Sequence, residues 1–260
     1  MKICISGLTA SGKTTLANAL HRHFGCAIFR ASSHLLDVLS TNRPPTTKEE
    51  RLLSWLTPHH ALDAMQLSER TKRVEDPTAD RAIDQLVLDI AKTTTTSLIF
   101  ESLTLPFLYP RPNDLFSVLL LASEERRSQH LSSILPLLHA SQHHTIIQRK
   151  DEMTRQVITR AWNKTVYEPS LYHFYDLILN DQGAMPLTAA QIAEVVIAAV
   201  HVYKCYQEPV TASFHTHALT TFRQSSTKMD AALLFSHVLL VSPASRGTPA
   251  IWFSRKGEYA

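Results

Sequence analysis

Residues 7–15, near the start of the chain, constrain the fold more than any other stretch. They read GLTASGKTT and fit the phosphate-binding pattern G-x-x-x-x-G-K-[ST]. The apolar run before them, at residues 2–6, predicts a short buried strand, and residues 14–20 after them predict the start of a helix. A strand, a glycine-bounded loop and a helix start are the context in which this pattern binds phosphate. The sequence therefore predicts a phosphate-binding loop here.

The residue types in this loop match what a polyphosphate requires. Gly7 and Gly12 permit a tightly curled backbone with inward N–H groups, and the first turn of the helix adds unpaired N–H groups. Lys13 is predicted to reach the β and γ phosphates, and the Thr14 hydroxyl is predicted to hold a Mg²⁺ that bridges them. The predicted donor-binding residues are Gly7, Thr9, Ala10, Ser11, Gly12, Lys13, Thr14 and Thr15.

Length and composition narrow the class of protein. The 260 residues suffice for one domain with an appendage or for two small domains, and the formal net charge of +3 suits an anionic small ligand as well as nucleic acid. The three cysteines form no C-x-x-C pair, which argues against a zinc site or a disulfide framework. The chain lacks both a secretory-signal pattern and an apolar run of bilayer length, so we expect a cytoplasmic protein with no membrane partner.

Apolar runs that alternate with helical patterns predict the core. Besides residues 2–6, strands are expected at residues 26–29, 97–101, 116–121 and 175–180. Further helices are expected from the serines at 32–33 to residue 39, at 48–70, at 78–92, after Ser123, at 148–164 and at 188–202. This alternation predicts a parallel, three-layer α/β sheet. The character changes after residue 203, so residues 204–260 are expected to form a C-terminal appendage.

Two positions that follow predicted strands are candidates for the functional site. Glu101 ends a buried strand, and ligands gather outside the carboxyl ends of strands in open α/β sheets. Glu101 is therefore predicted to orient the Mg²⁺ or to accept a proton from the acceptor, the alternative being a solvated carboxylate. Ser32 and Ser33 follow the second strand, where they serve either as a helix cap or as a lining of the acceptor pocket.

A second chemical signal lies at residues 148–164, where basic residues gather on a predicted helix. Asp151 precedes Arg155 by four residues and so shares its helical face. A solvated helix laced with ion pairs explains this spacing by itself. The functional alternative is that these cations cover the transferring group, because phosphoryl transfer requires neutralising charge beyond the phosphate loop.

Taken together, residues 1–203 resemble the cytidylate kinase-like branch of the P-loop nucleoside monophosphate kinases. Beyond the phosphate loop, the resemblance rests on an ordered set of segments: VEDPTADRAID at 74–84, LIFES at 98–102, QRKDEMTR at 148–155 and YDLILND at 175–181. The resemblance implies a P-loop kinase core that transfers the γ-phosphoryl group of ATP, with Mg²⁺, to a nucleotide-like acceptor. It also implies a helical acceptor lobe at about residues 31–92 and a lid at about residues 126–165.

The resemblance also implies roles for residues of the expected lid. Arg149 and Arg155 are expected to lie over the phosphates, with Asp151 positioning them or the acceptor. Arg126 or Arg127 is expected to support the lid. Closure of such a lid excludes water, which would otherwise hydrolyse ATP. The predicted catalytic residues are Lys13, Glu101, Arg149, Asp151 and Arg155.

The acceptor half of the site departs from the family's pattern. Members usually carry Gly-Arg after the acid of the third strand, whereas Ser102 and Leu103 stand here. Members also tend to carry Ser-Gly and then Arg in the helix after the second strand, whereas residues 33–38 here read SHLLDV. Two expected anchors for an acceptor phosphate are thus missing. The predicted acceptor-binding residues are Ser32, Ser33, Asp37 and Glu101.

These observations predict a Mg²⁺- and ATP-dependent kinase whose acceptor is a nucleotide or a hydroxyl-bearing small molecule. Two alternatives stay open. One is a kinase acting on a hydroxyl in nucleic acid, for which the mild basic excess offers little support. The other is a regulatory module that binds a nucleotide and has no acceptor. The sequence leaves the oligomeric state open.

Overall fold

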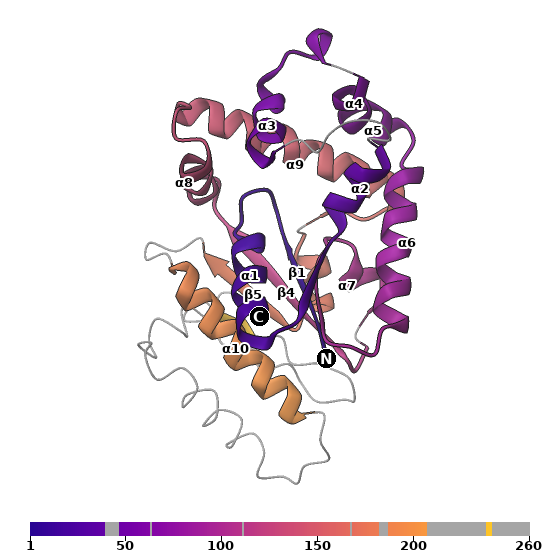
Figure 1. The fold of residues 1–260 in the computed structure, drawn as a ribbon, viewed down its shortest axis with the longest axis vertical. Coiled ribbons are helices and arrows are strands. Elements are labelled where there is room, and N and C mark those ends of the chain that lie inside the picture. The colour runs from indigo at the N-terminus through magenta and orange to yellow at the C-terminus, as the bar shows by residue number, and fades with distance from the viewer. Residues whose placement is uncertain are drawn as a thin grey trace.

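A single β-sheet forms the centre of the computed structural model (Figure 1). The structure describes residues 1–39, 47–62, 64–110, 112–166, 168–181, 187–206 and 238–240. Within these residues the strand order is β2-β3-β1-β4-β5-β6. The strands are β1 (Lys2–Gly7), β2 (Ala27–Arg30), β3 (Leu98–Glu101), β4 (Leu115–Ala122), β5 (Leu177–Asp181) and β6 (Val238–Leu240). Strands β1 to β5 pair in parallel, as predicted, whereas β6 pairs antiparallel with β5.

Helices flank this sheet and extend beyond one end of it. The α-helices are α1 (Lys13–Phe24), α2 (Ala31–Leu39), α3 (Lys48–Leu53), α4 (Ala64–Leu67), α5 (Arg73–Glu75), α6 (Thr78–Thr93), α7 (Leu105–Leu108), α8 (Glu124–Ile134), α9 (Ala140–Trp162) and α10 (Ala189–Tyr206). Shorter helical turns are η1 (Ser54–Leu56), η2 (His59–Ala61), η3 (Ser68–Lys72, a π-helix) and η4 (Pro169–Phe174). The described helices and strands therefore alternate, as the sequence predicts for an α/β fold.

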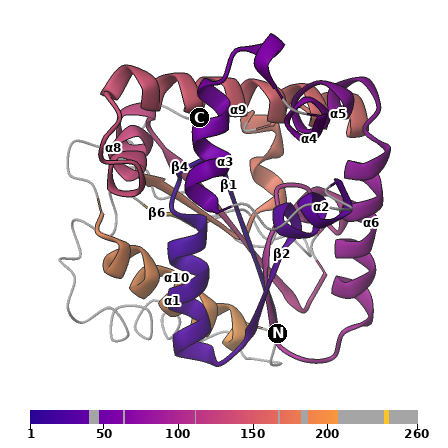
Figure 2. The ribbon, with the colours of Figure 1, turned by 45° about the horizontal axis from the view of Figure 1, so that its top comes forward.

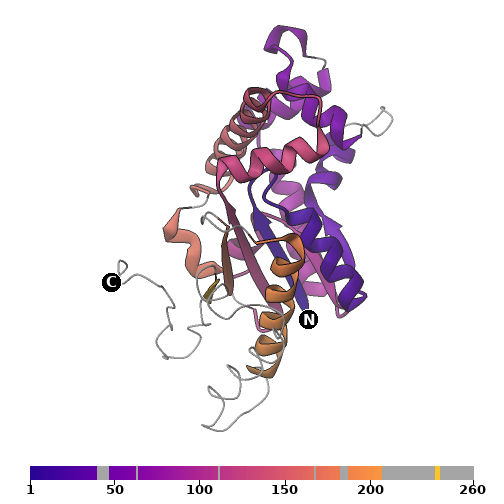
Figure 3. The ribbon, with the colours of Figure 1, turned by 90° about the vertical axis from the view of Figure 1, so that its left-hand side faces the viewer.

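The two faces of the sheet bury different sets of side chains, because successive residues of a strand point to opposite sides. On one face, Ile3 and Ile5 of β1 pack in a cluster with residues of α1 and α10. On the other face, Cys4 packs in a cluster with residues of α6 and α7. Figure 3 shows α1 in indigo and α10 in orange beside the first of these faces. Three layers result, with β1 buried on both sides.

A third apolar cluster joins helices beyond the carboxyl ends of the strands. Leu52 of α3 and Trp55 of η1 pack with Ile146, Ile147 and Met153 of α9. Figures 1 and 2 show α3, α8 and α9 together past the ends of β1 and β4. This cluster holds part of the predicted acceptor lobe against the predicted lid helix, and it stands over the edge of the sheet where the phosphate loop lies.

Local sequence signals set the ends of several helices. Gly25 takes the left-handed conformation after α1, with a φ of 67°, and its N–H donates to the carbonyl oxygen of His21. The Ser123 side chain caps α8 by accepting from the backbone N–H of Arg126. Helix α6 (Thr78–Thr93) spans the whole range expected for residues 78–92 and one residue more. Local sequence signals therefore fixed these ends.

Two predictions about helices are wrong. The helix expected over residues 48–70 is broken into short pieces, with Pro58 between η1 and η2, where proline offers no backbone N–H to continue a helix. Helix α2 begins at Ala31, so Ser32 and Ser33 lie inside its first turn and do not cap it. The strand β2 runs directly into this helix, which leaves no loop for a serine cap.

The expected appendage contributes one described strand, β6, which pairs with β5 at the edge of the sheet. Residues 207–237 and 241–260 of this appendage lie outside the described residues. Within the described part of the chain, no helix combines the length and apolar character needed to cross a lipid bilayer.

Candidate functional site

The phosphate loop lies between the end of β1 and the start of α1. Gly12 has a φ of 93°, a left-handed value that favours glycine. A Cβ atom added to Gly7 would lie 2.3 Å from Ser11 Oγ and 3.0 Å from the carbonyl oxygen of Leu120. The two glycines of the motif are therefore needed for different reasons: Gly12 for its backbone angle and Gly7 for the close approach of neighbouring atoms.

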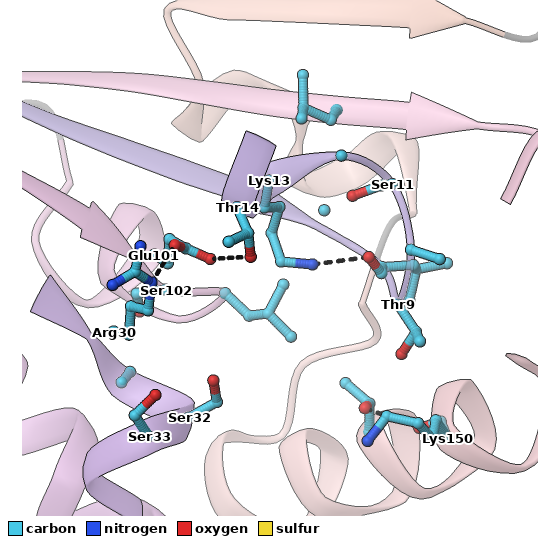
Figure 4. A pocket seen from close by; sticks show the side chains of 18 of the residues that line it. Thr9, Ser11, Lys13, Thr14, Arg30, Ser32, Ser33, Glu101, Ser102 and Lys150 are labelled. Carbon is cyan, nitrogen blue, oxygen red and sulfur yellow. Dashed lines mark hydrogen bonds and ion pairs between the residues drawn. The ribbon is translucent and has the colours of Figure 1, made fainter. Parts of the chain in front are cut away.

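Lys13 begins α1 and points back across the loop (Figure 4). Its Nζ donates to the carbonyl oxygen of Leu8 at 2.7 Å. Burial lowers the pKa of Lys13 to about 8, and the negative charges of Glu101 and Asp151 act in the opposite direction. An anion bound beside Nζ stabilises the charged form of this lysine, so the position favours an anionic ligand.

Thr14 and Glu101, predicted as a pair at the metal site, lie together at the carboxyl edge of the sheet. Thr14 Oγ1 donates to Glu101 Oε2 at 3.0 Å, and Glu101 Oε1 accepts from Arg30 Nε at 2.9 Å (Figure 4). Arg30 and Glu101 are register partners in the pairing of β2 with β3. Sequence reasoning missed Arg30. The signal was present, since each residue ends its strand, but the strand order had to be known to use it.

Helix α8 contacts the phosphate loop with two side chains. Arg127 Nη1 donates to the carbonyl oxygen of Thr9 at 3.3 Å, and His130 Nδ1 donates to that of Ala10 at 2.8 Å. Arg127 also forms an ion pair with Asp151 of α9, and both residues are buried, with exposures of 6% and 2%. Burial raises the pKa of Asp151, while the hydrogen bond from Arg127 lowers it. This buried pair ties α9 to α8 and to the loop.

A cavity of about 730 Å³ opens on the phosphate loop and continues between the helices. Its size falls in the range of small-molecule binding sites. The loop, Arg30, Glu101 and Ser102 form its donor side. The opposite part, which we call the helical wall, consists of the lining residues of α3, α5, α6 and α9: Lys48, Arg51, Leu52, Arg73, Asp80, Ile83, Asp84, Lys150, Met153, Thr154, Val157, Ile158, Ala161 and Trp162.

Asp84 is the most strongly perturbed acid of the helical wall. Its Oδ1 accepts from Thr104 Oγ1 at 2.6 Å, and its Oδ2 accepts from Trp162 Nε1 at 2.7 Å. Burial raises the pKa of Asp84 to about 6, although these two hydrogen bonds act in the opposite direction. Beside it, Arg73 and Asp80 form a two-pronged ion pair that also lines the cavity.

Sequence reasoning assigned no role to Arg73, Asp80 or Asp84. The signal was the spacing of the two acids, since residues four apart lie on one face of a helix. Asp80 and Asp84 fall inside the segment VEDPTADRAID, and Arg73 directly precedes it. That segment supported the family resemblance without suggesting a site. Which face of α6 meets the cavity depends on how α6 packs against α2 and α9.

The predicted acceptor residues have different positions in the structure. Ser32 and Ser33 line the cavity, and Figure 4 shows both side chains below Arg30. Asp37 belongs to α2, and its side chain lies outside the described residues. Glu101 lines the cavity on its donor side.

The predicted lid cations do not share the cavity with the loop. Among the described residues, neither Arg149 nor Arg155 lines it. Arg149 Nη1 donates to the carbonyl oxygen of Trp55 at 2.7 Å, and Arg155 pairs with the exposed Glu152 one turn away. Asp151, also predicted as catalytic, is a residue of α9 that forms an ion pair with Arg127 of α8. The roles assigned to these three residues stay predictions.

A family model described as an AAA domain matches residues 3–133, about half of the chain. The chain belongs to this family. The matched AAA domain runs from β1 through α8 and contains the phosphate loop, Glu101 and Arg127, whereas α9 lies beyond it. No curated protein sequence matches the chain.

Several solved structures are similar to this chain at low sequence identity. An uncharacterized protein from Eubacterium ventriosum is 11% identical, with a TM-score of 0.52, and the match covers 77% of this chain and 98% of that one. A shikimate kinase from Acinetobacter baumannii is 15% identical over 78% of this chain and 94% of that one, with a TM-score of 0.43. A deoxyadenosine kinase from M. mycoides is 13% identical over 77% and 99%, with a TM-score of 0.38. The first of these likenesses supports the fold.

Proposed function

We propose that the protein is an ATP- and Mg²⁺-dependent kinase that phosphorylates a small molecule bound against the helical wall. One observation carries the proposal. Lys13, Thr14 and Glu101 converge on one side of a continuous cavity, and the opposite side presents charged and polar groups from α3, α5 and α6. A donor nucleotide and an acceptor can therefore bind in one cavity, which phosphoryl transfer requires because it depends on positioning.

The donor side fits a magnesium ion. The Thr14 hydroxyl and the Glu101 carboxylate supply two oxygen atoms, 3.0 Å apart, that can act as metal ligands. Mg²⁺ takes oxygen ligands and usually keeps waters and phosphate oxygens in its shell, so a site with few protein ligands suits it. Thr14 and Glu101 would hold the ion, which when bound would neutralise charge on the donor phosphates. Lys13 adds a positive charge for the β and γ phosphates.

The helical wall supports an acceptor that carries an anionic group, such as a nucleotide. The two arginine anchors of cytidylate kinase-like proteins are absent from the sequence around residues 33–38 and at Leu103. Cations from other elements, namely Lys48, Arg51 and Arg73, line the cavity instead. The Arg51 guanidinium can bind phosphate oxygens through paired hydrogen bonds, and the Lys48 ammonium adds a further positive charge, whereas the guanidinium of Arg73 is engaged by Asp80.

In the proposed reaction, an oxygen atom of the acceptor forms a bond to the γ-phosphorus. The bond between the γ-phosphorus and the β,γ-bridging oxygen breaks, and its electron pair leaves with ADP. If the acceptor group is a hydroxyl, its proton passes to solvent water, whereas a phosphate acceptor releases none.

Transfer of the terminal phosphate tests this function. ATP labelled at the γ position is incubated with pooled nucleosides, nucleotides and sugars, and label on an acceptor is measured. Lys13→Ala should abolish transfer with its circular dichroism unchanged, while Lys92→Ala, which removes an exposed lysine of α6, should transfer normally. Transfer that survives in Lys13→Ala would refute the kinase. Tight ATP binding without transfer to any acceptor would instead favour a regulatory module.

A further inference from the structure

The face of α9 that meets the cavity carries one cation. Lys150, Met153, Thr154 and Val157 line the cavity, and their spacing of three and four residues places them on one side of the helix. Met153 and Val157 are buried in the cluster that joins α9 to α3 and η1. Packing of these apolar neighbours therefore decides that Lys150, and neither Arg149 nor Arg155, faces the phosphate loop.

Lys150 is held in place by an aromatic ring from the acceptor lobe. Its Nζ lies 4.6 Å from the centre of the Trp55 ring, and Arg70 Cζ lies at the same distance from that ring. Trp55 itself is only 2% exposed. A cation near the face of a buried tryptophan gains more than one near an exposed ring, because less water competes for it.

A backbone contact reinforces this arrangement. Arg149 Nη1 donates to the carbonyl oxygen of Trp55 at 2.7 Å, so the residue before Lys150 fastens η1 to α9. Arg149 therefore contacts the acceptor lobe and does not line the cavity. The side chain of Trp55 and the backbone of Trp55 are contacted by adjacent residues of one helix, which fixes both the position and the direction of Lys150.

Lys150 and Lys13 face each other across the cavity (Figure 4). They are close enough for the charge of Lys150 to oppose protonation of Lys13. Two like charges on facing walls destabilise the empty site and favour an anion between them. The γ-phosphate of a nucleotide seated on the loop is the group that Lys13 is expected to reach.

We infer that Lys150 is the cation of α9 that contacts the γ-phosphoryl group of the donor, and that Trp55 is a positioning residue that aims it. This inference rests on the proposed function for its catalytic part. As the γ-phosphoryl group passes from ATP to the acceptor oxygen and leaves ADP behind, Lys150 neutralises charge on the equatorial oxygens of that group. Because Trp55 belongs to the acceptor lobe, the lobe also controls the cation that acts on the donor.

Binding measurements test the inference without any acceptor. Calorimetry gives the Kd values of Mg²⁺-ADP and of the non-hydrolysable β,γ-imido analogue of ATP. Lys150→Met should weaken binding of the triphosphate about tenfold or more and change binding of ADP less than about twofold. Lys150→Arg should keep the discrimination, and Arg160→Met, which removes an exposed cation of α9, should leave both Kd values unchanged. Equal effects of Lys150→Met on both nucleotides, or none, would overturn the inference.

Trp55 and the reaction itself provide a second readout. Trp55→Leu should reduce discrimination between the two nucleotides in the same direction as Lys150→Met, whereas Trp55→Phe, which keeps a ring, should largely restore it. With an acceptor that takes up label, Lys150→Met should lower kcat about a hundredfold with little change in acceptor KM. If wild-type protein transfers no label, the proposed kinase fails while the two Kd values still decide whether Lys150 contacts the γ-phosphate.

Discussion

Asp84, a half-buried acid of the helical wall, gives a prediction of definite size for the free energy of unfolding. Asp84 has a pKa raised by burial from 3.8 to about 6, so its charge destabilises the folded protein above that pH. Between pH 3.8 and about 6 the folded state holds a proton that the unfolded state has lost. The free energy of unfolding therefore rises as the pH falls through about 6. At 1.36 kcal/mol per pKa unit, the full effect is about 3 kcal/mol.

Asp84→Asn removes this titration while keeping the shape of the side chain. Linkage predicts that lowering the pH from 7 to 4.5 raises the free energy of unfolding of the wild-type protein by about 2 kcal/mol relative to that of the variant. This is less than the full effect because the remainder lies below pH 4.5. Urea unfolding followed by far-ultraviolet circular dichroism at both pH values, at one ionic strength, measures the difference. Asp89→Asn, at an exposed position of the same helix, is the matched control. Identical pH dependence in wild type and Asp84→Asn would refute the reasoning.

Two further substitutions test the surroundings of the phosphate loop. Gly7→Ala places a Cβ atom 2.3 Å from Ser11 Oγ and 3.0 Å from the carbonyl oxygen of Leu120, so either the Ser11 side chain or the loop must move. We expect a free energy of unfolding in urea lower by about 1–3 kcal/mol and at least a tenfold weaker Kd for Mg²⁺-ATP, and an unchanged Kd would contradict the packing argument. Arg127→Met leaves Asp151 buried without its ion-pair partner and should cost about 3–5 kcal/mol in urea unfolding. Adding Asp151→Leu should recover part of that loss, and a double variant less stable than the single one would show that the pair is not what Arg127 stabilises.

Much of the sheet was predictable because its signals are local. The buried strand before the loop, the glycine at the end of α1 and the serine cap of α8 each depend on a few neighbouring residues. The stretch at residues 48–70 was predicted wrongly because its apolar spacing suggested one helix, while Pro58 and contacts with α9 favour short pieces. Tertiary packing overrides propensity where the local signal is weak.

The site divides in the same way. The loop residues and Glu101 could be named from the sequence, since a motif and a strand end fix them, but Arg30 required the register of β2 with β3. Asp84 and Arg73 required the packing of the acceptor lobe on α9. On α9 itself, the basic composition and the family resemblance indicated Arg149 and Arg155, whereas burial of Met153 and Val157 turns Lys150 to the cavity.

The sequence by itself determined that this chain builds a phosphate loop on a parallel sheet. A run of nine residues contains the backbone angles, the lysine and the hydroxyl that the loop needs, so no distant contact has to be known. Only the tertiary structure decided what faces that loop. The opposite wall is assembled from α3, α5, α6 and α9, and which of their side chains point inward depends on how apolar faces far apart in the sequence pack together.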